Sequence, residues 1–184
     1  MTKFIGIRHE DKYKMERRAP LTPGQVEKLV KQKKLDFVVQ SSAKRVFSED
    51  EYLQAGADVA EDLKKCSVIF GVKEMPIEFF EKGKTYVFFS HVIKGQSYNM
   101  PMLKQMMELK CNLIEYEKVV DEQGKRLIFF GRYAGLAGMI NSLWALGLRL
   151  KDYRLGTKLS KLKQAKDYHS LNEAKEAVSL VGQQ

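Results

Sequence analysis

Apolar residues in this sequence gather into short runs of strand length, separated by longer stretches with helical spacing. The short runs contain β-branched and aromatic residues and end abruptly in polar ones, which is typical of strands buried on both faces of a parallel sheet. We expect strands at residues 3–8, 36–40, 67–72, 86–89, 111–116 and 126–130. Strands that alternate with helices predict an α/β domain with a mostly parallel sheet.

Helix-start signals lie between these runs. Thr22 is a good N-cap and Pro23 suits the first helical position. Ser48 is followed three residues later by Glu51, which predicts a capping box. Ser170 predicts the start of a last helix. Further helices are expected at residues 102–109 and 131–150, and a hairpin turn at residues 121–124.

The helix expected at residues 131–150 contains many small residues in its first half. They are Gly131, Ala134, Gly135, Ala137 and Gly138. Residues without large side chains let another backbone approach closely. We therefore expect this face to be buried against a neighbouring segment.

No GxGxxG sequence follows a predicted strand and opens a helix. The nearest candidate is Gly131-x-x-x-Gly135-x-x-Gly138, and its spacing is wrong for a dinucleotide site. The pattern thus predicts a three-layer, Rossmann-like domain that lacks the dinucleotide fingerprint.

Two ionisable residues follow neighbouring apolar runs. Lys73-Glu74 ends the run at residues 67–72, and His91 comes two residues after the run that ends at Phe89. Open parallel sheets place ligands at the carboxyl ends of their strands. An ammonium and an imidazole at such an edge can move protons to and from a carbonyl or an amine. The alternative is that Lys73 only pairs with a nearby acid and His91 is an ordinary loop residue.

Charge and composition narrow the classes of partner. The chain has 184 residues, enough for one ordinary domain, and a net charge of +9 from 32 Lys and Arg against 23 Asp and Glu. The excess lies mainly in lysines on or beside predicted helices, where charge usually forms a solvated face. Because no nucleic-acid motif accompanies it, we expect no nucleic acid and favour small anionic substrates such as carboxylates.

The charged residues near the start of the chain and the two cysteines predict where in the cell the protein is located. Charged residues interrupt the first ten positions, so no secretory signal is expected there, and the longest uncharged stretch, Tyr133–Leu148, is short for a membrane span. Cys66 and Cys111 each precede an apolar run and match no metal-ligand spacing. We expect a cytoplasmic protein with no membrane contact and no metal.

Several blocks, taken in order, resemble the N-terminal substrate domain shared by alanine dehydrogenase, nicotinamide nucleotide transhydrogenase and lysine-forming saccharopine dehydrogenase. The blocks SHVIKGQSYNMP and FGRYAGLAGMI favour the saccharopine branch, including lysine–ketoglutarate reductase. The resemblance spans roughly Phe4 to Gly182. Its blocks are ERRAPLTP, GVKEMP, FFSHVIKGQ, YNMP, LIEYE and FGRYAGLAGMI.

The resemblance implies a chemistry and a set of site residues. The family reaction is the reductive amination of a 2-oxo acid, or its reverse, with NAD(P) carrying the hydride. The acid–base positions of the family fall on Lys73 and His91, and its carboxylate-binding arginine falls on Arg18. Glu74 and Glu117 match acidic positions suited to the amino group of the second substrate, or they are simply partners for Lys or Arg.

The chain departs from the family pattern at its end. In full-length members a nucleotide-binding domain follows, whereas only two residues remain here after Gly182. We therefore expect residues 1–150 to form the substrate domain, and residues 151–184 to be a basic linker and helix leading toward an absent nucleotide-binding domain. No cofactor is expected on this chain alone. The alternative is a stand-alone amino-acid or oxo-acid binding module that pairs with a separate nucleotide-binding chain.

Overall fold

The computed structural model describes residues 4–182 and forms two compact units, which divide between Ile128 and Phe129. The division expected from the sequence lies after residue 150. The difference concerns the long helix α4 (Gly131–Asp152), which packs on the segment that directly follows it and so belongs with the C-terminal unit.

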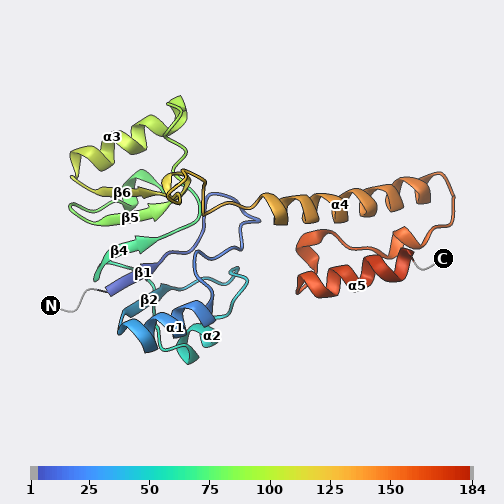
Figure 1. Ribbon diagram of the computed structural model, residues 1–184, viewed down its shortest axis with the longest axis horizontal. Coiled ribbons are helices and arrows are strands. Elements are labelled where there is room, and N and C mark those ends of the chain that lie inside the picture. The colour runs from blue at the N-terminus through green and yellow to red at the C-terminus, as the bar shows by residue number, and fades with distance from the viewer. Residues whose placement is uncertain (1–3, 183–184) are drawn as a thin grey trace. The chain divides into compact units, whose positions relative to one another are not determined.

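The first unit is built around a six-stranded, all-parallel sheet with the order β3-β2-β1-β4-β5-β6 (Figure 1). This confirms the predicted α/β class. The predicted strands match five of the six, and the short β3 was not foreseen. The strands are β1 (Phe4–Ile7), β2 (Asp36–Gln40), β3 (Asp58–Ala60), β4 (Cys66–Phe70), β5 (Thr85–Phe88) and β6 (Asn112–Glu115).

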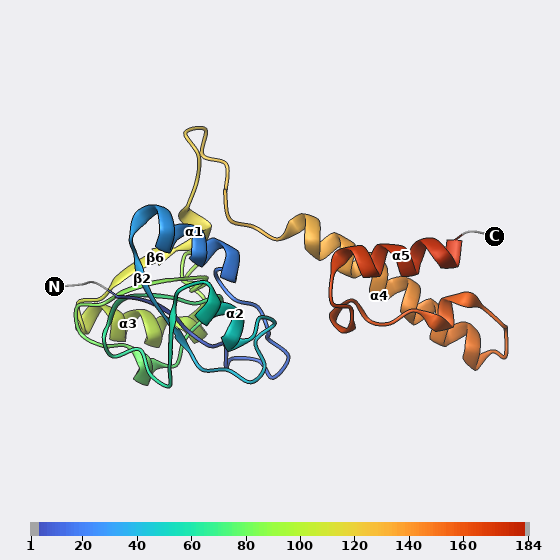
Figure 2. The same cartoon turned by 90° about the horizontal axis from the view of Figure 1, so that it is seen from below.

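The strand expected at residues 126–130 is wrong. The turn at residues 121–124 forms. The segments on its two sides, however, are joined by a single antiparallel β-bridge, between Val120 and Arg126. The segment extends from the sheet as a narrow hairpin (Figure 2), so it has no neighbouring strand to complete a ladder.

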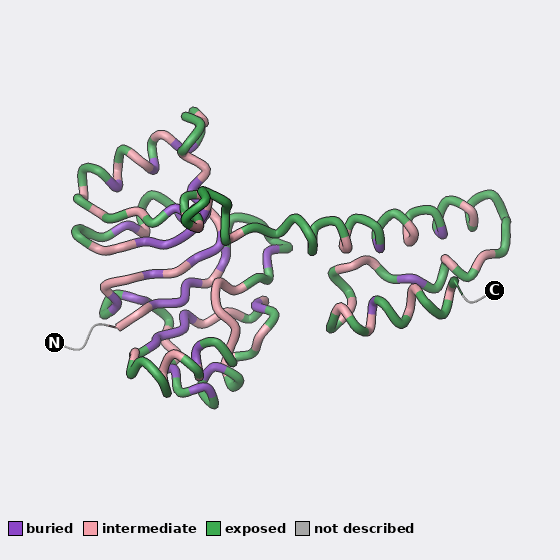
Figure 3. Tube along the Cα trace, viewed as in Figure 1, coloured by how far each residue is buried: buried purple, intermediate pink, exposed green. Residues whose placement is uncertain are grey.

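Helices cover the two faces of the sheet. Helices α1 (Pro23–Lys33) and α2 (Glu49–Gln54) pack through Val26 and Tyr52 on one face, where they meet Ile7 and Val39. Helix α3 (Met100–Glu108) packs on the opposite face, together with the 3₁₀ turn η1 (Ile77–Phe79). Successive strand residues point to opposite faces, and the residues of the central strands β1 and β4 are buried or half-buried (Figure 3, purple and pink).

The predicted helix starts are present in atomic detail. Thr22 and Gln25 form a reciprocal capping box at α1, and Ser48 and Glu51 form one at α2. Each box satisfies backbone N–H groups that a helix start leaves without partners. These caps fix the point at which the chain leaves the edge of the sheet and enters the helix.

The second unit contains α4, the 3₁₀ turns η4 (Lys158–Lys161) and η5 (Ala165–Asp167), and α5 (Leu171–Gly182). The segment expected to be a plain linker is therefore partly ordered, and Leu162 is buried. The expected burial of the small-residue face of α4 is wrong in this chain, because Gly135 and Gly138 are exposed and have no neighbour within contact distance. Among the described residues, no helix is both long and apolar enough to cross a bilayer.

The close backbone approach on α4 occurs at Gly147 instead. A Cβ there would lie 2.5 Å from the carbonyl carbon of Leu159. We expect Gly147→Ala to lower the free energy of unfolding of this unit by about 1–3 kcal/mol, because backbone rather than a flexible side chain must move. Gly138→Ala is the matched control and should be neutral or stabilising by up to about 1 kcal/mol, since its position is open and alanine favours the helix. Chemical denaturation of both variants measures the difference, and equal stabilities would contradict the packing.

Candidate functional site

Three of the candidate residues, Lys73, Glu74 and His91, lie at the carboxyl ends of β4 and β5, which are neighbouring parallel strands. The pairing continues past the strands, since Phe89 N donates to Val72 O at 3.1 Å. On the segment after β4, this bond is followed by Lys73 and Glu74. On the segment after β5, it is followed by His91. Topology thus brings to one edge the residues that the sequence pattern placed at strand ends.

Glu74 is the centre of the polar network. Its side chain is 8% exposed, and its Oε1 atom accepts hydrogen bonds from Lys12 Nζ at 2.7 Å, His91 Nδ1 at 2.9 Å and Asn99 Nδ2 at 3.2 Å. Burial alone would raise the pKa of this carboxyl, but these donors outweigh burial and lower it to about 2. Its second oxygen, Oε2, is buried and has no hydrogen-bond partner among the described residues.

His91 has an unusual backbone conformation for a residue with a Cβ. Its φ angle is 51°, in the left-handed region, and its ring stacks on Phe89 with a centroid distance of 6.2 Å. A carboxylate only accepts hydrogen bonds, so in the neutral ring the hydrogen lies on Nδ1, which faces Glu74. The other nitrogen, Nε2, then carries the lone pair that accepts a proton.

Glu10 holds the loop that carries Lys73. Its carboxylate is 4% exposed and accepts the backbone N–H groups of Val72 at 2.7 Å and Lys73 at 2.9 Å. Burial raises the pKa of Glu10, although these two bonds act in the opposite direction. The position of the Lys73 backbone therefore depends on a buried acid from the loop after β1.

Arg18 is held by an acid of its own loop. Glu16, which is buried, accepts from Arg18 Nε at 2.7 Å and from its backbone N at 3.1 Å. Burial raises the pKa of Glu16, but Arg18 outweighs it, with a further contribution from the charge of Lys73, and the pKa is lowered. The Arg18 side chain remains 44% exposed. The neighbouring Arg17 instead donates to the carbonyl of Lys44.

Glu117 lies apart from this network. It follows β6 in the 3₁₀ turn η3 (Tyr116–Lys118) and pairs with Arg126 Nη2 at 3.4 Å. No contact in the part of the chain that the structure describes joins it to Glu74 or His91. This arrangement matches the alternative interpretation, in which Glu117 is the partner of an arginine.

Four residues of the site are not predicted from the sequence: Lys12, Glu10, Glu16 and Asn99. The first three belong to the dense polar loop HEDKYKMERR, and Asn99 belongs to the YNMP block. A signal was present, because a polar loop after the first strand of a parallel sheet lies at the ligand edge. The pairing of each acid with a particular partner needs the three-dimensional structure.

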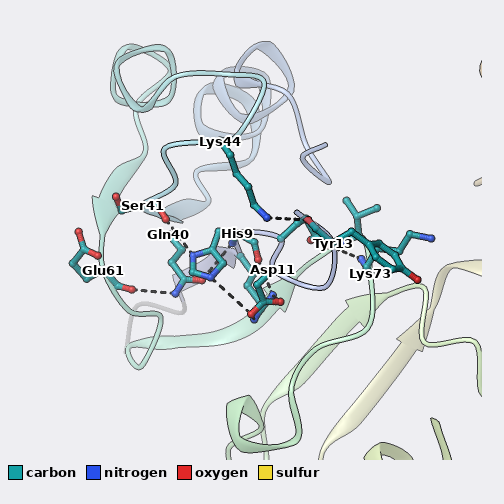
Figure 4. Close-up of polar contacts among 11 residues, drawn as sticks. His9, Asp11, Tyr13, Gln40, Ser41, Lys44, Glu61 and Lys73 are labelled. Carbon is teal, nitrogen blue, oxygen red and sulfur yellow. Dashed lines mark hydrogen bonds and ion pairs between the residues drawn. The ribbon is translucent and has the colours of Figure 1, made fainter. Parts of the chain in front are cut away.

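The rim of the site is tied together by contacts between the loops that follow β1 and β2 (Figure 4). His9 Nδ1 lies 3.2 Å from Ser41 O, and Lys44 Nζ donates to Tyr13 O at 3.1 Å. Beside this rim is a cavity of about 400 Å³ next to the Glu74 network. It is lined by Asp11, Lys12, Glu74, Met75 and Pro76.

A dinucleotide does not fit the turn between β1 and α1. This turn, residues 8–22, contains no glycine and holds the buried acids Glu10 and Glu16, whose charges would repel a pyrophosphate. The start of α1 is also closed by the side chains of Thr22 and Gln25. The turn after β1 therefore lacks the glycine-rich, phosphate-binding geometry of a dinucleotide site.

Comparison with known proteins connects this geometry to a family. The sequence profile of the alanine dehydrogenase/PNT N-terminal domain matches residues 6–137. The chain is 39% identical over 180 residues to the mitochondrial alpha-aminoadipic semialdehyde synthase of Rattus norvegicus, covering 97% of this chain and 19% of that protein. It is 32% identical over 160 residues to the NAD(+)-dependent, L-lysine-forming saccharopine dehydrogenase of Candida glabrata, covering 83% and 42%.

Solved structures support the same fold. An L-alanine dehydrogenase superposes with a TM-score of 0.62 and 21% identity over 96% of this chain and 52% of that one. A transhydrogenase from Sinorhizobium meliloti gives a TM-score of 0.54 with 18% identity over 81% and 43%. The chain thus spans about a fifth of the synthase and less than half of the saccharopine dehydrogenase that it resembles.

Proposed function

Since the chain belongs to the alanine dehydrogenase/PNT N-terminal domain family, we propose that it is the substrate-binding domain of a saccharopine dehydrogenase-like oxidoreductase. The enzyme would act on the CH–NH bond of an amino acid and use NAD(P), and this domain would be inactive alone. The name of the saccharopine dehydrogenase supports L-lysine as one substrate. The resemblance to lysine–ketoglutarate reductase implies a 2-oxo acid such as 2-oxoglutarate as the other.

The Glu74 network carries this proposal. A buried carboxylate with one satisfied oxygen and one without a partner suits the cationic amino group of an amino acid, and Glu74 lines a cavity. His91 is joined to the same carboxylate through Nδ1. An amino group that binds at Glu74 would therefore lie close to the His91 ring, whose Nδ1 atom faces the carboxylate.

The proposed roles follow from the chemistry of each residue. Lys73 exchanges a proton with the reacting carbonyl or imine, and His91 exchanges one with the substrate nitrogen through Nε2. Arg18, oriented by Glu16, binds the carboxylate of the oxo acid. Glu74 binds the amino group. Glu117, which pairs with Arg126 outside the Glu74 network, is given no role in substrate binding. A bound nicotinamide would supply the hydride.

The hydride carrier requires a second domain in this proposal. The lengths of the relatives support a nucleotide-binding domain, supplied either in the same polypeptide or by a separate chain. The proposal includes neither nucleic acid nor membrane as a partner. A cytoplasmic location is also part of it, and it agrees with Cys66 and Cys111 both being free thiols.

The binding role is tested directly on the 184-residue chain by NMR. L-Lysine and 2-oxoglutarate are titrated separately into the ¹⁵N-labelled protein, and amide shifts are followed residue by residue. We expect the amino acid to perturb Glu74 and His91, and the oxo acid to perturb Arg18 and Lys73. Saturable shifts confined to other residues, or none at tens of millimolar ligand, would contradict the proposal.

Arg18 provides a kinetic prediction. In the intact enzyme, or with this chain rejoined to a nucleotide-binding domain, Arg18→Ala should mainly raise KM for the oxo acid, because a bidentate carboxylate contact is lost. Arg18→Lys keeps the charge but loses the planar fork, so it should also be impaired. Arg17→Ala is the matched control. An unchanged KM in Arg18→Ala would remove Arg18 from the substrate site.

The chain alone should not bind the nicotinamide cofactor. We expect no measurable NADH or NADPH binding in a fluorescence titration, since the turn after β1 has no glycine and holds buried acids. Binding in the micromolar range would contradict this expectation. It would require a nucleotide site elsewhere on the chain.

A further inference from the structure

Asn99 connects the two sides of the Glu74–His91 pair. It lies at the end of the 3₁₀ turn η2 (Ser97–Asn99), just before α3, and is 5% exposed. Its Nδ2 atom donates to Ser90 O at 2.8 Å and Glu74 Oε1 at 3.2 Å, and lies 3.5 Å from His91 O. The buried side-chain amide of Asn99 therefore contacts both the Glu74 carboxylate and the backbone on either side of the His91 Cα atom.

The contacts of Asn99 bear on the backbone conformation of His91. The left-handed φ angle of 51° is unfavourable for a residue with a Cβ, so the surrounding contacts must hold it. The carbonyls before and after the His91 Cα both face the Asn99 amide. The ring is thereby directed so that Nδ1 meets Glu74, and Nε2 is left as the proton acceptor.

We infer that Asn99 is a positioning residue, which fixes the conformation and the tautomer of His91 for proton transfer at Nε2. The catalytic part of this inference rests on the proposed function, because it takes His91 as the proton-transfer group. The tautomer itself is a property of the folded chain and does not depend on any substrate.

The test is the ¹⁵N spectrum of the His91 ring in the 184-residue chain, recorded over a series of pH values so that the signals of the neutral ring are identified. The wild type should show hydrogen on Nδ1. Asn99→Ala should lose this single tautomer and shift the backbone signals of His91 away from left-handed values. Asn112→Ala, which removes an exposed amide from β6, is the matched control and should leave His91 unchanged.

Asn99→Asp is the second variant and keeps the shape of the side chain. It replaces the donor by an oxygen that faces the Glu74 carboxylate and two carbonyls, so the same loss of the Nδ1–H form is expected. If Asn99→Ala does not fold, this isosteric variant decides the question. Folded variants that retain the wild-type tautomer and backbone shifts would overturn the inference.

A kinetic readout separates positioning from general stability. In the intact enzyme, Asn99→Ala should lower kcat on the order of 100-fold with little change in KM, as expected for a misplaced proton-transfer group. If the chain binds neither lysine nor the oxo acid, the proposed function fails while the tautomer result stands. If binding persists and the tautomer is unaffected by Asn99, the positioning role fails alone.

Discussion

Replacing Lys73 by methionine is expected to lower kcat by roughly 10²–10⁴-fold, the range in which a positioned acid–base group contributes. Methionine keeps much of the length of the side chain and removes the ammonium. The backbone at this position is held by Glu10 rather than by the lysine side chain, so the loop should keep its place. Steady-state kinetics in the intact enzyme, or in this chain rejoined to a nucleotide-binding domain, measures the effect.

The control for Lys73→Met is Lys82→Met, which removes an exposed lysine outside the site. It should leave kcat and KM unchanged. A Lys73→Met enzyme with normal turnover would show that another group transfers the proton. A rise in KM with unchanged kcat would instead assign Lys73 to substrate binding.

Local signals in the sequence account for most of the first unit. Strands buried on both faces have a distinctive apolar pattern, and the caps at Thr22 and Ser48 are local in sequence, so both are readable without a structure. The two failures depend on long-range packing. The segment at residues 126–130 has strand-like residues but no strand beside it, and the glycines of α4 permit a close approach that occurs only at Gly147.

The candidate site likewise has features that the sequence predicts and features that depend on long-range packing. Lys73 and His91 were found because strand ends in a parallel sheet share one edge, which is a rule of topology. The partners of these residues come from other segments of the chain, such as Glu10 for the Lys73 backbone, 63 residues away, and Glu74 for the His91 ring, 17 residues away. Sequence spacing alone does not reveal such contacts, since they arise from the way in which three loops fold over one edge.

Replacing Glu74 by glutamine should remove a large part of the acid sensitivity of the first unit. The pKa of Glu74 is lowered from its ordinary value of 4.5 to about 2 in the folded protein. A lowered folded pKa means that the ionised group stabilises the fold above pH 4.5, and that this contribution is lost as the pH falls from 4.5 toward 2. The change corresponds to roughly 3 kcal/mol, because each tenfold change in proton affinity is worth about 1.4 kcal/mol.

Urea denaturation of the wild type and Glu74→Gln from pH 7 to pH 2 measures this contribution as a difference between two curves. At pH 7 the variant should be less stable by roughly 3 kcal/mol, because the Lys12 ammonium, the His91 Nδ1–H group and the Asn99 amide lose their charged acceptor. By pH 2 most of the difference should be lost, since wild-type Glu74 is then about half protonated in the folded protein and almost fully protonated in the unfolded one. Glu78→Gln, an exposed acid on η1, is the control and should follow the wild type at every pH. A stability difference that stays constant between pH 7 and pH 2 would show that Glu74 acts through its shape rather than its charge.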